Sequence, residues 1–128
     1  MDQLTGRNLL IVDDEQDVLM FLSMILCKRG FKVTSSHTTD GIGDLLAAHP
    51  ELILLDINMP GMMGTEICEL IKRSPSQMNT PVILMSGSYD LEQQAKNCGA
   101  DAWLAKPFEP STLVSMIEGY FPKGVIVN

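Results

Sequence analysis

The chain has 128 residues, 45% of them hydrophobic and 20% charged, and a net charge of −7 at pH 7. This length suits one domain with its own hydrophobic core, so we expect a single domain over residues 1–128 with its core at about 7–122 and a short C-terminal tail. No apolar run approaches the ~20 residues that cross a bilayer, which argues against a membrane protein. The acidic excess argues against direct nucleic-acid binding, because that affinity comes largely from Lys and Arg.

The N-terminus and the cysteines both favour a cytoplasmic location. The opening residues "MDQLTGRNLLIVDDE" lack the basic stretch, long apolar run and small-residue cleavage site of a secretory signal. Cys27, Cys68 and Cys98 form no CxxC pair, and any disulfide would leave one of them unpaired. We therefore predict buried, unreactive thiols in a reducing compartment.

Strand and helix patterns alternate along the whole chain. "NLLIVD" is rich in branched apolar residues and predicts a strand at 8–13, after which Val18, Phe21, Leu22 and Ile25 recur at helical spacing until Gly30. The same alternation predicts strands near 31–35, 51–56, 81–85 and 101–104, and helices near 39–48, 65–73, 89–97 and 110–121.

The first, third and fourth strands are apolar throughout rather than alternating. Their sequences, "LLIV", "LILL" and "PVILM", are typical of parallel strands that helices cover on both faces. The sequence therefore predicts an α/β fold, a doubly wound five-stranded parallel sheet with five helices in a three-layer sandwich.

Polar side chains follow four of these strands, at the edge where doubly wound sheets bind their ligands. They are Asp13 and Asp14, then Asp56, then Ser86 and Gly87, then Lys106. Taken singly, each aspartate could be a helix N-cap, the serine a turn residue and the lysine a solvated surface amine. Their coincidence at one edge indicates a shared site.

The chemistry of these residues points to phosphoryl transfer. Three carboxylates repel one another unless a cation compensates them, and oxygen ligands without His or Cys favour Mg²⁺ over zinc. Mg²⁺ commonly adds phosphate oxygens to one or two carboxylates. Asp56 is then best placed as a nucleophile, with Lys106 neutralising phosphate charge, Ser86 donating its hydroxyl and Gly87 allowing close backbone approach.

The motifs "LLIVDDE", "LILLDINMPGMMG", "PVILMSG" and "GADAWLAKPF" resemble the receiver domain of two-component response regulators, over essentially the whole chain. The resemblance implies a flavodoxin-like strand order of 2-1-3-4-5. It also implies a role for each matching residue: Asp56 as phosphoacceptor, Asp14 as a direct Mg²⁺ ligand, Asp13 as a ligand through water, the Asn58 carbonyl as a further ligand, Ser86 and Lys106 as phosphate contacts, and a cis peptide bond before Pro107.

The resemblance further implies a signalling switch that catalyses only its own phosphorylation and dephosphorylation. A histidine kinase or histidine phosphotransfer protein would phosphorylate Asp56, and an output partner would read the face formed by the fourth helix, fifth strand and fifth helix. Ser86 and Trp103 would couple the site to that face. Two residues depart from the common pattern: Gly87 stands where alanine is frequent, and Trp103 where Tyr or Phe is usual.

Two other functions compete with this hypothesis. An aspartyl-phosphate phosphohydrolase usually carries a second Asp two residues after its nucleophile, where this chain has Asn58, and no cap domain is visible. A pseudo-receiver that docks partners without phosphate is expected to lose part of the acidic pair, acceptor or lysine, all of which are present.

The remaining candidate residues have simpler interpretations. We expect His37 and His49 at the surface or in capping roles, away from the acidic cluster. The nine methionines, including Met59, Met62 and Met63, could form a docking surface but are predicted to fill gaps in the core.

Overall fold

The computed structural model describes residues 6–121, which form five strands and five helices in strict alternation. In chain order these are β1 (Asn8–Val12), α1 (Gln16–Lys28), β2 (Lys32–Ser36), α2 (Ile42–Ala47), β3 (Leu52–Asp56), α3 (Gly64–Arg73), β4 (Val82–Ser86), α4 (Leu91–Cys98), β5 (Ala102–Ala105) and α5 (Pro110–Glu118). Every predicted element is present, with ends that differ by a few residues.

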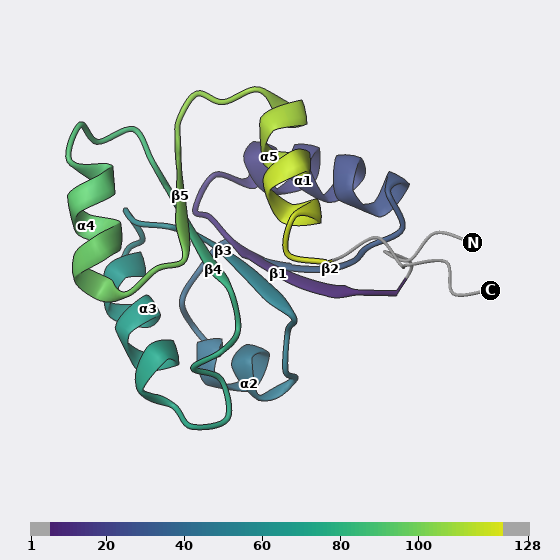
Figure 1. Cartoon of the computed structure of the whole chain (residues 1–128). Helices are drawn as coiled ribbons and strands as arrows, with labels where there is room; N and C mark the ends of the chain where they lie inside the picture. The colour runs from purple at the N-terminus through teal and green to yellow at the C-terminus, as the bar shows by residue number, and fades with distance from the viewer. Residues whose placement is uncertain (1–5, 122–128) are drawn as a thin grey trace.

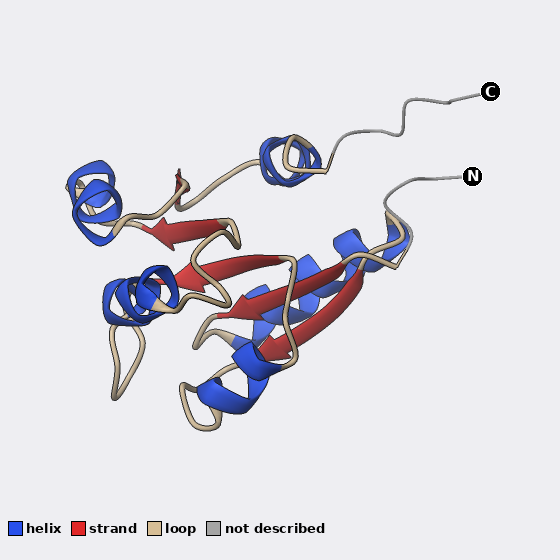
Figure 2. Ribbon diagram, turned by 60° about the horizontal axis from the view of Figure 1, so that its bottom comes forward, coloured by secondary structure: helices blue, strands red, loops and turns tan. Residues whose placement is uncertain are grey.

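The strands form one parallel sheet in the order β2-β1-β3-β4-β5, which confirms the predicted topology. Figure 1 shows α1 and α5 together on one side of the sheet, and α2, α3 and α4 on the other. Figure 2 shows the strands side by side between these two helical layers. The fold is therefore the three-layer doubly wound sandwich that the apolar strands predicted.

The central strands send alternate side chains into two separate cores, because successive residues of a strand point to opposite faces. Leu9 and Ile11 of β1 pack with α1 and α5, whereas Leu10 and Val12 pack with α3 and α4. All five residues of β3 and of β4 are buried. This two-sided burial explains why these strands are apolar up to the polar residues that end them, Asp56 and Ser86.

The helix ends differ most from the prediction at α2 and α5. The predicted helix at 39–48 shortens to Ile42–Ala47, because Gly41 at its N-cap has a left-handed backbone (φ 73°). The predicted helix at 110–121 ends at Glu118. Gly30 has φ 97° directly after α1, so it closes that helix as predicted.

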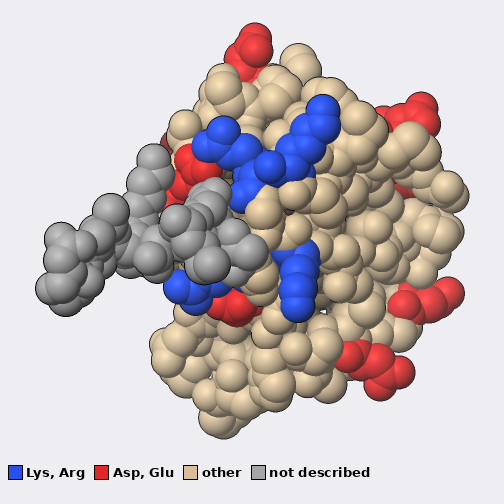
Figure 3. All heavy atoms as spheres, turned by 90° about the vertical axis from the view of Figure 1, so that its right-hand side faces the viewer, with Lys and Arg blue, Asp and Glu red and all other residues tan. Residues whose placement is uncertain are grey.

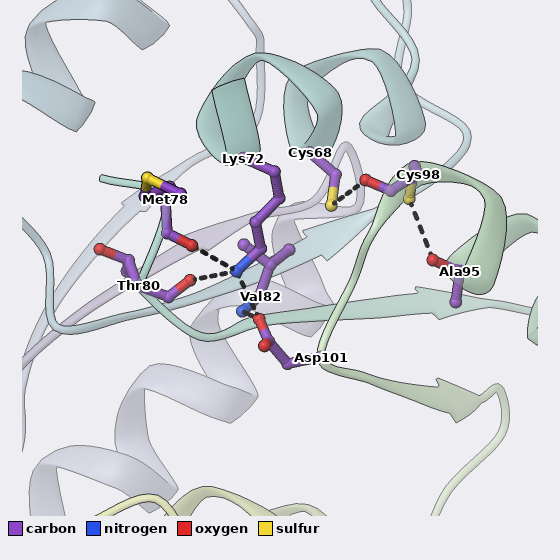
Figure 4. A network of polar contacts seen from close by, with 8 residues as sticks. All are labelled: Cys68, Lys72, Met78, Thr80, Val82, Ala95, Cys98 and Asp101. Atoms are coloured by element: carbon purple, nitrogen blue, oxygen red, sulfur yellow. Dashed lines mark hydrogen bonds and ion pairs between the residues drawn. The ribbon is translucent and has the colours of Figure 1, made fainter. Parts of the chain in front are cut away.

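A lysine joins three segments at the end of the sheet opposite the strand-end aspartates (Figure 4). Lys72 of α3 donates hydrogen bonds to the carbonyl oxygens of Met78 (3.3 Å) and Thr80 (2.8 Å) and to Asp101 Oδ2 (2.7 Å). The same Asp101 oxygen accepts the backbone N–H of Val82 at 2.8 Å. This network ties α3 to the starts of β4 and β5.

The buried-thiol prediction holds for two cysteines and is wrong for the third. Cys68 and Cys98 are buried between α3 and α4, and the Cys68 thiol donates to the Cys98 carbonyl oxygen at 3.5 Å (Figure 4). Burial raises the pKa of the Cys68 thiol, which keeps it protonated and unreactive. Cys27 is exposed because it lies on the outer face of α1.

The packing prediction for methionine is only partly correct. Met59 and Met85 are buried, but Met20, Met24, Met63 and Met78 are exposed.

His37 and His49 are exposed, as expected for surface residues.

Charge is distributed unevenly over the surface. In Figure 3, Lys and Arg side chains gather near the middle of one face, while Asp and Glu side chains lie around its rim and also beside these basic side chains. None of the helices between residues 6 and 121 has the length and apolar character that a bilayer crossing requires.

Candidate phosphoryl-transfer site

The sheet brings the predicted site residues together at the carboxyl ends of its strands. Asp13 directly follows β1, Asp56 ends β3, Ser86 ends β4 and Lys106 directly follows β5. Two backbone hydrogen bonds extend the sheet to this edge: the N–H of Asp13 donates to Ser36 (3.1 Å), and that of Lys106 donates to the Ser86 carbonyl (2.9 Å). The backbone ladder therefore fixes where these side chains start.

Lys106 lies among three carboxylates at this edge. Its Nζ donates to Asp13 Oδ2 at 2.7 Å and lies 3.6 Å from Asp56 Oδ2 and 3.6 Å from Glu15 Oε1. Burial tends to lower the pKa of Lys106, but its hydrogen bond to Asp13 and the three negative charges outweigh that effect, so the pKa is raised. The lysine is therefore a fixed positive charge at neutral pH.

Asp56 is the carboxyl group whose titration the fold changes most clearly. It is 4% exposed, and burial together with the charge of Asp13 raises its pKa from 3.8 to about 6. A contact with the Asp14 carboxyl raises the pKa further, while Lys106 lowers it. Without a metal, the site therefore disfavours the ionised form of the Asp56 carboxyl. The carboxyl is nevertheless mostly ionised at pH 7, because its pKa lies about one unit below that pH.

The acidic residues have the composition of a site for a hard cation. Carboxylate oxygens of Asp13, Asp14 and Glu15 lie within 4.8 Å of one another, and Asp14 also contacts Asp56. The Lys106 ammonium group faces this excess of negative charge. Oxygen donors crowded in this way suit Mg²⁺, which takes carboxylate oxygens and keeps several waters.

The helix-capping interpretation of the acidic pair is not what the structure shows. The N-cap of α1 is Glu15, and the Asp13 carboxylate instead accepts the backbone N–H of Glu15 at 2.9 Å. Glu15 itself was missed as a candidate site residue. The signal was its place as the third acidic residue in the run "DDE".

Ser86 and Gly87 follow one another at the end of β4, at the edge of the site. Ser86 is buried, and its Oγ accepts the backbone N–H of Ser88 at 3.0 Å, so the predicted turn role is present. A methyl group at Gly87 would meet only the Lys106 carbonyl oxygen, at 3.8 Å, an ordinary contact. The protein chain therefore leaves room for an alanine at position 87. The backbone N–H of Asn58 lies 3.4 Å from Asp56 Oδ1.

Trp103 connects β5 to α4. It pairs in register with Leu84 of β4, packs partly buried against the core beneath α3 and α4, and has Lys96 Nζ 5.8 Å from its ring centroid. The Lys96 contact could not be predicted from the sequence pattern. The peptide bond between Lys106 and Pro107 is cis, as the resemblance implied.

A parallel doubly wound sheet with an acidic cluster, a buried aspartate and a lysine at its carboxyl edge is the arrangement that the resemblance to receiver domains implied. The sequence profile described as "Response regulator receiver domain" matches residues 9–118. The chain therefore belongs to the response regulator receiver domain family.

Individual relatives agree with this membership. The chain is 32% identical over 123 residues to Protein PilG of Pseudomonas aeruginosa, covering 94% of this chain and 91% of PilG. It is 30% identical to the phosphate regulon transcriptional regulatory protein PhoB of the same species, but spans only 52% of that protein. The structure of the chemotaxis response regulator CheY4 of Vibrio cholerae superposes with a TM-score of 0.83 at 28% identity, covering 91% of this chain and 99% of that one.

Membership of this family implies a role in signalling. Receiver domains act as signalling switches in two-component systems, where response regulators interact with histidine kinases and output domains.

Proposed function

We propose that this domain accepts a phosphoryl group on Asp56 from a histidine kinase or a histidine phosphotransfer protein. The observation that carries the proposal is the pairing of a buried, mostly ionised aspartate with a lysine ammonium 3.6 Å away at the carboxyl edge of the sheet. A nucleophile for phosphorus must be ionised, and it needs positive charge beside the oxygens that gain electron density.

The transfer exchanges one bond to phosphorus for another. A carboxylate oxygen of Asp56 attacks phosphorus in line, a new O–P bond forms, and the bond from phosphorus to the donor nitrogen breaks with its electrons returning to the histidine ring. Lys106 moves from Asp13 to the phosphoryl oxygens, and Ser86 donates its hydroxyl to one of them. Asp13, Asp14, Asp56 and the Asn58 carbonyl would hold Mg²⁺, which supplies further positive charge to the phosphoryl oxygens when bound.

An exposed apolar patch beside the site supports a protein as phosphodonor. Met20, Phe21 and Met24 of α1 are 65%, 49% and 54% exposed, on the helix that begins directly after the acidic run. Exposed apolar side chains grouped in this way mark protein interaction sites. Replacing Phe21 with Gln should slow transfer from a phosphorylated histidine phosphotransfer domain that labels the parent, without changing labelling by acetyl phosphate.

The deciding experiment uses acetyl phosphate, because the domain supplies its own catalytic groups. We expect Mg²⁺-dependent formation of an alkali-labile acyl phosphate in the parent protein and in Asp44→Asn, an exposed carboxylate on α2. Asp56→Asn should not be labelled. Equal labelling of Asp56→Asn and the parent would refute the assignment of the phosphoacceptor.

The output is proposed to run through the face formed by α4, β5 and α5, with Ser86 and Trp103 as the coupled pair. Trp103 is the chain's only tryptophan, so its fluorescence reports one position. We expect phosphorylation to change its emission and quencher access in the parent but not in Ser86→Ala. The same change in both proteins would contradict the coupling. The cytoplasmic location expected from the sequence stays a prediction.

A further inference from the structure

Among the described ion-pair partners of Lys106, Glu15 is the one that the proposed phosphoryl transfer does not use. Its Oε1 lies 3.6 Å from Lys106 Nζ, the same distance as Asp56 Oδ2. The two neighbours differ in environment, because the Glu15 side chain is 64% exposed and that of Asp56 is 6% exposed. Lys106 therefore lies between an acceptor inside the site and a competing carboxylate at its rim.

The shortest contact of Lys106 must break before the lysine can serve the phosphoryl group. In the structure its Nζ lies 2.7 Å from the buried Asp13 carboxylate. A cation held by Asp13 and Asp14 would take up the Asp13 charge and repel the ammonium, which weakens this contact. The lysine then has two remaining carboxylates within reach, and only one of them leads toward phosphorus.

We propose that Glu15 is a positioning residue that holds Lys106 at the rim of the site, and so limits the fraction of molecules in which the lysine contacts the phosphoryl oxygens. This inference rests on the proposed function and adds a determinant of its rate. Glu15 is the N-cap of α1, and its backbone N–H donates to the Asp13 carboxylate at 2.9 Å. The Glu15 side chain therefore starts from the same turn as Asp13 and Asp14, and from there it reaches Lys106.

Removing the Glu15 charge should speed phosphorylation. Exposed ion pairs are weak, so we expect the rate with acetyl phosphate at saturating Mg²⁺ to rise about two- to fourfold in Glu15→Gln. The gain should shrink toward zero at 1 M salt, where charges separated by more than ~3 Å are screened. A purely structural role for Glu15 would not depend on salt in this way.

Asp17→Asn is the matched control, because it removes an exposed carboxylate from the first turn of α1, whereas the described ion pairs of Lys106 run to Asp13, Glu15 and Asp56. Its rate should equal that of the parent. An equal gain in Asp17→Asn would mean that general repulsion of the anionic donor is the cause, and would overturn the proposal.

A double-mutant cycle isolates the contact with Lys106. In a Lys106→Met background, whose fold is checked by circular dichroism, Glu15→Gln should no longer change the rate. A gain that persists without the lysine would refute the proposal. The comparison of Glu15→Gln with Asp17→Asn tests the same specificity without removing Lys106.

Magnesium titrations separate positioning from metal binding. Half-saturation of the labelling rate by Mg²⁺ should change less than about twofold in Glu15→Gln, whereas loss of a metal ligand weakens binding at least tenfold. A weakening of that size would assign Glu15 to the metal and overturn its role on the lysine. If the parent is labelled at Asp56 but Glu15→Gln matches it, only this inference fails. If the parent is not labelled at all, the proposed function fails.

Discussion

Replacing Asp56 with Asn should stabilise the metal-free domain, although it removes the proposed phosphoacceptor. The folded state raises the pKa of Asp56 from 3.8 to about 6, chiefly through burial and the charge of Asp13. The folded protein therefore binds this proton more tightly than the unfolded chain does. The free energy of unfolding therefore falls as the pH rises from about 4 to about 6, because the Asp56 carboxyl ionises less readily in the folded state than in the unfolded chain.

The magnitude follows from linkage between protonation and folding. Each pKa unit is worth about 1.4 kcal/mol, so the rise costs about 3 kcal/mol above pH 6 and nothing below pH 4. Asn has nearly the same shape and no charge, and Lys106 keeps its closer partner Asp13 at 2.7 Å. We therefore expect Asp56→Asn to be about 2–3 kcal/mol more stable at pH 7.5, and equal to the parent below pH 4.

Urea denaturation in EDTA, followed by circular dichroism at a series of pH values, measures this difference. Asp44→Asn controls for loss of a carboxylate, and its stability should stay parallel to that of the parent across the series, because Asp44 is exposed. Saturating Mg²⁺ should shrink the gap, since the ionised Asp56 then contributes to metal binding. An Asp56→Asn protein that is no more stable at pH 7.5, or a gap that persists below pH 4, would refute the reasoning.

Further predictions concern the metal site and two structural contacts. Mg²⁺ at ten times its dissociation constant should stabilise the domain by about 1.4 kcal/mol, and Asp14→Asn should weaken that response while stabilising the metal-free form; coincident melting curves with and without Mg²⁺ would contradict a shared site. Gly64→Ala should destabilise by about 2–3 kcal/mol in urea titrations, because its Cβ would lie 2.3 Å from the Asp56 carbonyl oxygen. Gly43→Ala is its control: the space there is open, so a helical alanine should add up to about 1 kcal/mol. Lys72→Met should cost about 1–3 kcal/mol, measured in the same way, because the carbonyl and carboxylate acceptors of Figure 4 lose their donor.

The fold was predictable where burial constrains the sequence on both sides. β3 and β4 are buried at every position, so the residues between the two helical layers are apolar up to the polar residue that ends each strand, and that apolar run is visible in the sequence. α2 has no fully buried residue, so its helical pattern is weak and its ends were predicted less well. The exposed Met20, Met24 and Cys27 were mispredicted for a related reason: composition favours burial for these residue types, but their place on the helix decides it.

The sequence predicted which residues form the site better than it predicted the side-chain contacts among them. Parallel strands bring their carboxyl ends to one edge, so the topology places Asp13 beside Asp56 on neighbouring strands and puts Lys106 at the same edge, after β5. Sequence order cannot say which acceptor a flexible lysine chooses. In the structure it bonds to Asp13 at 2.7 Å and stays 3.6 Å from Asp56. The reach of Glu15 depends on the same side-chain geometry, which explains why it was missed.

The burial of Asp56 lowers the stability of the metal-free domain but favours the proposed phosphoryl transfer. A buried carboxylate with a raised pKa lowers the free energy of unfolding of the metal-free domain. An apolar residue of similar size at this position would avoid that loss if stability alone mattered. The same burial excludes water from the nucleophile and strengthens its interaction with Lys106. One lysine cannot compensate Asp13, Asp14 and Asp56 together, so the edge retains a negative charge that only a bound cation or a proton relieves. The unbalanced charge thus makes folding and metal binding respond to each other.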